Sequence, residues 1–367
     1  MVIAEFIFYF STIVHLLITI SLGWPIWRYK NAAHYTRSEN GFSIIICAHN
    51  ELENLKQNVP SILEQDYTTY EVIIVLDRST DDSFEFLQEI FSKDSRLKVL
   101  TINHIPEGFH PKKYGLTKAI EIAQFDWILL TDADSKPRSK NWIKTFNALI
   151  TPQKEIILGL SPYLKNHGLL ANLISFETYQ TALTYIGTAL QKKAYMGVGR
   201  NLAYRKNLFL DGDGFGPYKD ITGGDDDLFV QQNATSTNTA INIDRDSITN
   251  SQPKRKWIAY LHQKTRHLSV GKFYLSGIKF RLTFYALTHM IMWLSFIILV
   301  SFNPGYWIIS ACFALVMLIK GLISIYTSQK LHIEWNLIWF PILDLVYAVL
   351  LPLIGLRSFL IKKIRWN

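Results

Sequence analysis

Apolar residues gather in long runs at both ends of the chain, and a more polar stretch lies between them. The first run covers residues 2–24, and three others cover residues 283–302, 306–326 and 337–356. Each run has about the length that a helix needs to cross the hydrocarbon core of a bilayer. We therefore expect an integral membrane protein in which residues 42–263 form a separate globular domain.

Basic residues follow the first apolar run at Arg28, Lys30 and Arg37. Because positively charged flanks stay in the cytosol, we expect the N-terminus outside and the globular domain in the cytosol. The run has neither a basic start nor a small-residue cleavage site behind it, which is unlike a removed signal peptide.

The last apolar run is unusual for a membrane span. It contains Asp344 between Pro341 and Pro352, and an acidic residue inside a span must face protein or water. If all three C-terminal runs crossed, the basic tail around Lys362 and Lys363 would lie outside, against the positive-inside bias. We expect this run to be either a transmembrane or a re-entrant helix.

The charge pattern favours membrane lipids as a partner. The net charge is +8, and the basic residues gather near the apolar runs rather than in the interleaved aromatic and basic stripe of nucleic-acid-binding proteins. Residues 264–281 mix Lys and Arg with Phe and Tyr, which favours an amphipathic helix on the cytosolic headgroups, or else an ordinary surface helix. Cys47 and Cys312 lie far apart and form no metal-binding pattern.

Short apolar strands alternate with helical stretches in the first half of the globular part. Strands are expected at 42–47, 70–76, 97–102 and 127–131, and helices at 52–63, 83–91 and 113–123. This alternation is typical of βαβ units and predicts an α/β fold with a mainly parallel sheet. Ligands bind beyond the carboxyl ends of such strands. The polar residues at these ends are His49, Asn50, Glu51, Asp77, Asp132 and Asp134.

Two carboxylates, Asp132 and Asp134, follow the fourth strand with one residue between them. In an extended segment they would point to the same side. Two carboxylates on one side can hold a hard divalent cation together with phosphate oxygens. The alternative is a turn or a helix-capping pair.

Asp77 ends the second strand, where a carboxylate can accept hydrogen bonds from a nucleobase or a ribose. Asp81 and Asp82 follow it and are expected to cap the next helix.

A third acidic site is Gly223-Gly224-Asp225-Asp226-Asp227. Crowded carboxylates repel one another, so the pKa of at least one should rise, which suits a general base acting on a hydroxyl. A capped helix start is the alternative, and one aspartate can cap while another catalyses.

Two further segments carry candidate binding residues. Arg266 can grip a diphosphate with bidentate geometry, while Gln263 and His267 can line an acceptor channel. Arg200 and Asn201 end the segment Gly-Val-Gly-Arg-Asn, whose glycines permit close backbone approach to an acceptor. A simple connecting loop is an equal alternative for that segment.

In this order, the motifs resemble those of membrane-bound family-2 glycosyltransferases with the GT-A fold, and the resemblance covers residues 42–267. The element from Gln263 to Arg266 resembles the Q-x-x-R-W motif of membrane-bound polysaccharide and glycolipid synthases. The matching residues are Ala48 to Glu51, Asp77, Lys112 and Lys113, Asp132 to Asp134, Gly224 to Asp226, and Gln263 with Arg266.

The resemblance implies an inverting transfer of a sugar from a nucleotide-sugar donor to a hydroxyl of a lipid-linked or glycan acceptor. It implies that Asp77 and the segment near His49 hold the nucleotide. It also implies that Asp134, with Asp132, holds Mg²⁺ or Mn²⁺ against the diphosphate. A bacterial inner membrane is the location that this group implies.

For the chemistry, the resemblance implies that Lys113 and Arg266 add positive charge to the leaving group. Asp226 is then the base, with Asp225 as the second choice.

The chain also departs from the family pattern, because His267 stands where the family usually has Trp, and the apolar runs are few. Both departures count against a processive polysaccharide synthase, which remains one alternative. A non-catalytic membrane scaffold with a degenerate transferase domain is another.

Overall fold

The computed structural model describes residues 2–30, 39–303, 305 and 307–360. The chain forms two compact units. The sheet unit comprises Lys30–Leu164 and Thr188–Gln252, and the helix unit comprises Met1–Tyr29, Lys165–Gly187 and Pro253–Asn367. Arg37 and the basic tail at 362–365, which entered the topology prediction, lie outside the described residues.

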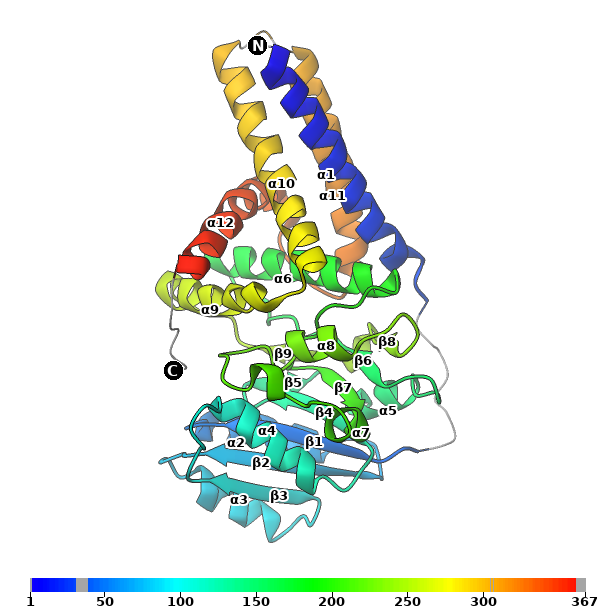
Figure 1. Ribbon diagram of the computed structural model, residues 1–367, viewed down its shortest axis with the longest axis vertical. Coiled ribbons are helices and arrows are strands. Elements are labelled where there is room, and N and C mark those ends of the chain that lie inside the picture. Colours follow the sequence, from blue (N-terminus) through cyan, green and yellow to red (C-terminus); the bar gives the residue numbers. More distant parts are fainter. Residues whose placement is uncertain (1, 31–38, 304, 306, 361–367) are drawn as a thin grey trace. The chain divides into compact units, whose positions relative to one another are not determined.

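A seven-stranded sheet is the centre of the sheet unit, with the strand order β3-β2-β1-β4-β7-β6-β8 (Figure 1). Only β7 runs antiparallel to its two neighbours, so the prediction of a mainly parallel sheet is confirmed. The strands are β1 (Phe42–Ala48), β2 (Tyr70–Asp77), β3 (Leu97–Ile102), β4 (Trp127–Asp132), β6 (Ile156–Leu158), β7 (Leu202–Arg205) and β8 (Thr239–Ile241).

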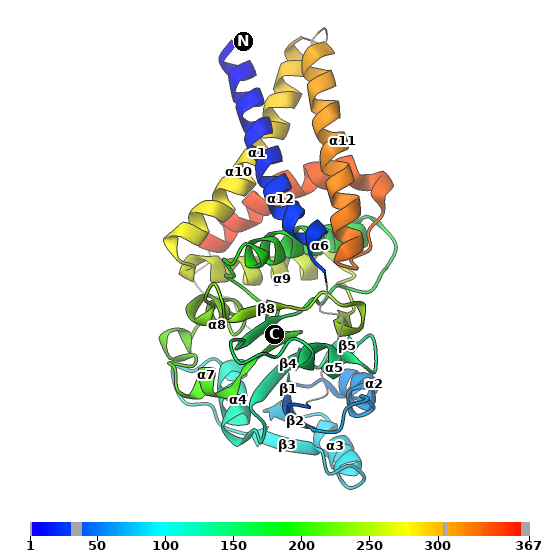
Figure 2. The same ribbon diagram turned by 90° about the vertical axis from the view of Figure 1, so that its right-hand side faces the viewer.

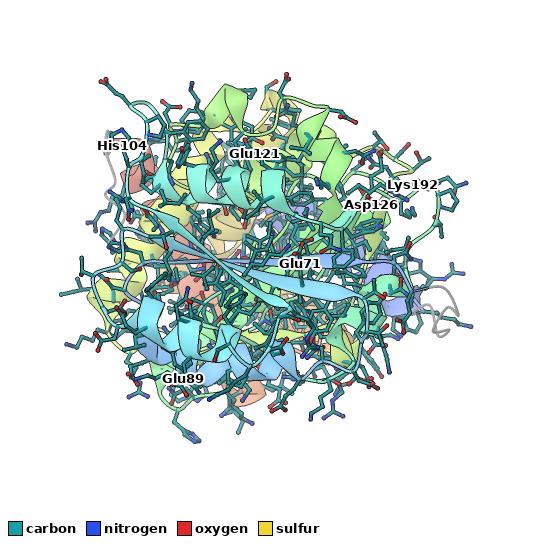
Figure 3. All side chains as sticks on the ribbon, turned by 90° about the horizontal axis from the view of Figure 1, so that it is seen from below. Glu71, Glu89, His104, Glu121, Asp126 and Lys192 are labelled. Atoms are coloured by element: carbon teal, nitrogen blue, oxygen red, sulfur yellow. The ribbon has the colours of Figure 1, made fainter. Side chains whose placement is uncertain are left out.

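Helices cover both faces of the parallel part of this sheet, as the near-continuous apolar sequences of β1 and β2 require. Figure 3 shows Glu121 of α4 on one side of the sheet and Glu89 of α3 on the other, with Glu71 of β2 between them. The first helices are α2 (Leu52–Leu63), α3 (Ser83–Phe91) and α4 (Pro111–Ile122), close to the predicted bounds.

Smaller elements complete the sheet unit. The strands β5 and β9 pair with each other in a separate two-stranded sheet. These elements are β5 (Ser135–Pro137), α5 (Trp142–Asn147), α7 (Lys206–Leu210), α8 (Asp227–Asn233) and β9 (Thr249–Ser251).

Six helices make up most of the described part of the helix unit. Four helices of the described chain are long and apolar enough to cross a membrane: α1, α10, α11 and the segment Leu337–Leu360, which contains α12. In Figures 1 and 2, α1, α10 and α11 run side by side, whereas α12 runs across them and packs on α9 and α10. The helices are α1 (Val2–Arg28), α6 (Leu169–Leu190), α9 (Trp257–Ser269), α10 (Ser276–Phe302), α11 (Trp307–Lys330) and α12 (Phe340–Leu360).

The expected amphipathic helix at 264–281 is not a single helix. Helix α9 ends at Ser269, a short 3₁₀ turn spans Val270–Phe273, and α10 begins at Ser276. Gly271, a weak helix former, lies in this turn. The basic and aromatic residues of the segment are therefore divided between two helices, and the expected domain boundary at Gln263 falls inside α9.

One close contact fixes how α6 packs on α1 within the helix unit. A Cβ atom on Gly187 would lie 2.6 Å from the carbonyl oxygen of Leu22, which is backbone and has little room to move. We predict that Gly187→Ala destabilises the protein by about 1–3 kcal/mol because the two helices must separate. Thermal unfolding of the purified protein in detergent measures this. Gly277→Ala in the first turn of α10, where a Cβ meets nothing within 4 Å, is the control and should change little.

Candidate active site

The carboxyl ends of β1 and β2 are tied together by side-chain hydrogen bonds. The ring of His49 contacts the carbonyl oxygen of Asp77. Asn50, at a positive φ of 54°, accepts a hydrogen bond from the Thr80 amide at 2.7 Å. Arg78 donates to both carboxylate oxygens of Asp77, at 2.8 and 3.1 Å. Asp77 is buried, whereas the Arg78 side chain is 47% exposed, so this guanidinium can move away from the carboxylate.

The capping prediction holds for one of the two aspartates that follow. Asp81 accepts hydrogen bonds from the amides of Leu52 and Ser83, at the starts of α2 and α3. Asp82 is the N-cap residue of α3 by position, but its side chain makes no capping hydrogen bond. Glu51 precedes α2 and accepts a hydrogen bond from Asn54.

Asp132 and Asp134 do not belong to one extended segment, so the argument from strand alternation is wrong. Asp132 ends β4, whereas Asp134 lies in a turn that leads into β5. The chain has to turn here because β5 pairs with β9 rather than continuing β4. One oxygen of Asp134 receives long contacts from the hydroxyls of Ser135 and Ser251, at 3.3 and 3.5 Å.

A single lysine connects two of the acidic segments. The Nζ atom of Lys112 lies 3.0 Å from a carboxylate oxygen of Asp132 and 3.0 Å from one of Asp225. Burial lowers the pKa of Lys112, but the two carboxylates outweigh burial and hold that pKa well above its usual value. Lys112 therefore carries a positive charge in the centre of the acidic cluster.

Lys113, the lysine that the resemblance assigned to the leaving group, contacts backbone carbonyl oxygens instead. Its Nζ atom donates to the carbonyl oxygens of Tyr218 and Ile221 and lies over the Tyr218 ring, with none of the residue exposed. These contacts hold the 218–221 loop. Lys112, which the resemblance matched without giving it a role, is the lysine that contacts the acidic cluster.

The first two aspartates of the acidic loop before α8, Asp225 and Asp226, have different partners. Gly223 and Gly224 both adopt positive φ angles, 81° and 79°, which glycine tolerates without strain. Asp225 then pairs with Lys112, while Asp226 caps α8 and accepts a hydrogen bond from the Asp227 amide at 2.8 Å.

The pKa values of these two aspartates move apart. Burial raises the pKa of Asp225, but Lys112 outweighs that effect and the pKa lies below its usual value. The pKa of Asp226 is raised by burial and by the charge of Asp225. The amide of Gly199 donates to Asp226 at 2.7 Å, and a Cβ on this glycine would lie 3.3 Å from the same oxygen. The glycine is needed because the backbone approaches the acid so closely.

Arg200 and Asn201 have separate roles. Arg200 donates to the Ser161 carbonyl at 3.0 Å and lies over the Tyr163 ring, within electrostatic range of Asp134. Asn201 is fully buried. Its amide group donates to two backbone carbonyls, and its oxygen accepts from the indole of a tryptophan. We assign Asn201 to the packing of this loop rather than to substrate binding.

The candidate residues of the sheet unit gather at one edge of the sheet. Burial raises the pKa of the Cys47 thiol at the end of β1, and the charges of Lys112, Asp225, Asp132 and Asp77 also act on it. Because β1 lies between β2 and β4, Asp77 and Asp132 stand on strands about 10 Å apart. The charges of Asp134, Asp132 and Asp226 likewise act on Arg200.

Gln263, Arg266 and His267 all lie on α9 of the helix unit. At 100° per residue the three positions fall within one arc of about 100° on the helix. They therefore share a face, and their roles in binding stay predictions.

The sheet and the acidic residues at its carboxyl edge define a GT-A fold. Residues 43–211 match the model of the family described as Glycosyl transferase family 2. A mannosyltransferase from Pyrobaculum calidifontis, solved in complex with GDP-Man and Mn²⁺, has the same fold, with a TM-score of 0.63 and 16% identity over 98% of this chain and 100% of that one.

Sequence relatives match a smaller part of the chain. An uncharacterized glycosyltransferase of Haemophilus influenzae is 32% identical over 23% of this chain and 30% of its own length. A UDP-Glc:α-D-GlcNAc-diphosphoundecaprenol β-1,3-glucosyltransferase of Escherichia coli is 34% identical over 25% of this chain and 34% of its own length. The chain thus spans about a third of the length of these relatives.

The contacts of Lys113 predict a purely structural phenotype. Lys113→Met removes the donor of two buried carbonyl oxygens, each of which costs about 1–3 kcal/mol when it is left unpaired. We expect a clear fall in melting temperature. Lys118→Met on the same helix, which loses an exposed pair with Glu121 and a 5.8 Å contact with the Tyr114 ring, is the control and should melt near the wild type. Equal melting of the two variants would contradict the structural role.

Proposed function

We propose that this protein is an inverting glycosyltransferase that moves a sugar from a nucleotide-sugar donor to a hydroxyl of a lipid-linked or glycan acceptor at the cytosolic face of a membrane. One observation carries the proposal. Carboxylates from β4 and from the loop before α8 meet around the partly buried charge of Lys112, at the carboxyl edge of a sheet whose sequence matches the glycosyl transferase family 2 model. Ligands of such sheets bind at this edge.

Asp77 and Lys112 are the proposed donor contacts. The Asp77 carboxylate can accept hydrogen bonds from a nucleobase or ribose once Arg78 swings away, since this arginine is half-exposed. Lys112, already held beside Asp132, replaces Lys113 as the cation that binds the diphosphate. His49 and Asn50 support this site by joining the β1 and β2 ends.

Asp132 and Asp134 are the proposed ligands of Mg²⁺ or Mn²⁺. Among the residues that the structure describes, no group of three or more His, Cys, Asp or Glu side chains could hold a metal alone. Two carboxylates still fit the ion, because Mg²⁺ is usually bound by one or two carboxylates together with substrate phosphates. The ion would neutralise charge on the departing diphosphate. The Mn²⁺ and GDP-Man in the Pyrobaculum structure support this proposal.

Asp226 is the proposed general base. Its raised pKa brings the carboxylate closer to the basicity that a general base needs, and the Gly199 amide fixes its orientation. Asp226 takes the proton as the acceptor oxygen bonds to the anomeric carbon. The bond from that carbon to the diphosphate oxygen breaks on the opposite face, so the anomeric configuration inverts and a nucleoside diphosphate leaves.

The long apolar helices of the helix unit support a lipid acceptor. A small crevice also lies in this unit. It lies between α6, α9 and α12, and we call it the α6–α9–α12 crevice. Its lining residues are Leu173, Glu177, Tyr260, Tyr347, Leu350, Leu351 and Ile354. The crevice itself holds a volume of only about 10 Å³, roughly that of one water molecule, so the lipid acceptor is inferred from the apolar helices and not from the crevice. The Escherichia coli relative, named for a diphosphoundecaprenol-linked acceptor, points to the same class. We place the protein in a bacterial inner membrane, with Gln263, Arg266 and His267 of α9 serving the acceptor and diphosphate.

A panel of nucleotide sugars tests the proposal directly. The purified full-length protein is incubated with each donor, with and without a polyprenyl-linked acceptor, and with Mg²⁺, Mn²⁺ or EDTA. We expect release of the nucleoside diphosphate from one uracil or guanine donor, loss of this activity in EDTA, and products that carry a single added sugar. Long products would favour a processive synthase, and no turnover of any donor would favour a scaffold.

The base assignment predicts the effect of Asp226→Asn. Transfer should fall by about 10²- to 10⁴-fold while the melting temperature and the affinity for the nucleoside diphosphate change little. Equilibrium binding and single-turnover transfer separate the two quantities. Normal transfer in this variant would show that Asp226 is not the base. Asp225→Asn is measured in the same assay, because Asp225 is the second candidate.

The charge of Asp225 also predicts a shift in pH dependence. Because Asp226 must be unprotonated to act, activity falls as the pH drops through the pKa of Asp226, which Asp225 raises. Asp225→Asn removes the neighbouring negative charge, so the acidic limb of the pH–rate profile should move to lower pH. The exposed Asp211→Asn in the same unit is the control and should leave the profile unchanged. If the acidic limb of the pH–rate profile stays in place in both variants, Asp226 is not the group whose titration produces that limb.

A further inference from the structure

A stretch of basic residues without any acidic residue spans the α9–α10 junction of the helix unit. Residues 254–281 hold eight Lys and Arg side chains and no Asp or Glu, and the nearest acidic residues along the chain are Asp246 and Glu334. Three of the eight, at the start of α9, are exposed and form no ion pair with any residue that the structure describes: Lys254, Arg255 and Lys256. Their charges therefore face outward without a partner in the described chain.

Two exposed apolar side chains follow these cations directly. Trp257 and Ile258, the first two residues of α9, are 44% and 83% exposed. Exposure to water is unfavourable for both side chains. Lys and Arg beside exposed Trp and Ile are typical of a surface that lies at the headgroup level of a bilayer. We call Lys254–Ile258 the basic–aromatic segment.

The basic–aromatic segment adjoins a helix with an exposed apolar side. Tyr260, two residues after Ile258, is buried and lines the α6–α9–α12 crevice together with Leu350 of α12. Leu353 and Leu356 of α12 are 55% and 65% exposed, and α12 belongs to one of the four segments that are apolar enough to cross a membrane. The start of α9 therefore lies beside a surface that suits lipid within the helix unit.

Helix α9 itself disfavours these three cations. Lys256 is the N-cap residue of α9, and its side chain makes no capping hydrogen bond. The N-terminal end of a helix carries partial positive charge, so cations are unfavourable there. An anionic lipid surface offsets this cost, because each Lys or Arg near such a surface strengthens binding by about fivefold. Three of them together favour an anionic over a neutral surface by roughly 100-fold.

We propose that the basic–aromatic segment binds the headgroups of anionic phospholipids, with its three cations on the phosphates and with Trp257 and Ile258 in the layer below them. A soluble anion would neutralise the cations but would leave Trp257 and Ile258 in water, so the apolar pair favours a lipid surface. The segment precedes Gln263, Arg266 and His267 on α9 and belongs to another unit than the acidic cluster. Binding of these lipids therefore does not depend on the proposed function.

Hydrogen exchange of the full-length protein in lipid nanodiscs tests the proposal. The discs contain neutral phosphatidylcholine alone, or phosphatidylcholine with about 30% phosphatidylglycerol. We expect residues 254–262 to exchange at least about tenfold more slowly in the anionic discs, because three Lys or Arg side chains engage the surface. About 0.5 M NaCl should abolish the difference, since salt screens these exposed charges. The variant Lys254→Gln/Arg255→Gln/Lys256→Gln should exchange alike in both discs.

Two further variants separate local charge from other effects. Lys56→Gln/Lys93→Gln/Lys140→Gln removes the same total charge from exposed positions of the sheet unit and should keep the full difference between the discs. Lys254→Arg/Arg255→Lys/Lys256→Arg keeps the charge of the basic–aromatic segment and should also keep it. All three positions are exposed, so both variants of the segment should melt with the wild type in detergent.

Several results would overturn lipid binding at this segment. They are equal exchange of the wild type in the two discs, a difference that survives in the glutamine variant, and a difference that is lost in the variant that keeps the charge. Equal protection of residues 254–262 by inorganic phosphate in neutral discs would also overturn it, because the segment would then be a site for soluble anions. None of these measurements involves sugar transfer, so a failure of the proposed function leaves them unaffected.

Discussion

The acidic edge of the sheet depends on one partly buried ammonium group, that of Lys112. Asp132 arrives at the end of β4 and Asp225 arrives with the loop before α8, and Lys112 lies 3.0 Å from each. Without a cation between them these carboxylates would repel each other, and Asp226 beside them would repel both. Lys112 is the second residue of α4, which begins at Pro111, a residue whose fixed φ suits the first turn of a helix. The start of one helix therefore allows acids from distant parts of the chain to gather.

The helix unit uses the same principle in an apolar setting. Two carboxylates are buried among its described residues: Glu177 is satisfied by two donors of α9, and Asp344 by donors of α10 and α11. Burying an ionised group without such partners is very costly, so its donors must stay in place while the fold persists. Each carboxylate thus links helices that apolar packing alone would leave free to rotate or slide, and together they fix the helices that line the α6–α9–α12 crevice.

The strands and helices up to β4 followed from the sequence because apolar periodicity and strand length are local signals. The errors arose where long-range contacts decide the structure. Asp134 lies in a turn because β5 pairs with β9, more than a hundred residues away. The spacing of residues in α4 could have indicated that Lys113 points inward. Lys113, Leu116 and Ile120 form the buried stripe of this helix, whereas Lys112 lies outside it. No local signal revealed that the amide of Asn201 is fully engaged by distant backbone.

The path of the chain links the two units through α6. The chain leaves the sheet unit at Lys165, forms α6 in the helix unit, and returns to the sheet unit at Thr188. Helix α6 carries Glu177, which holds α9, and the segment after it carries Gly199, whose amide bonds to Asp226. Under the proposed function, the donor-binding residues belong to the sheet unit and the acceptor-binding residues of α9 belong to the helix unit, so substitutions for one specificity fall in a different unit from substitutions for the other.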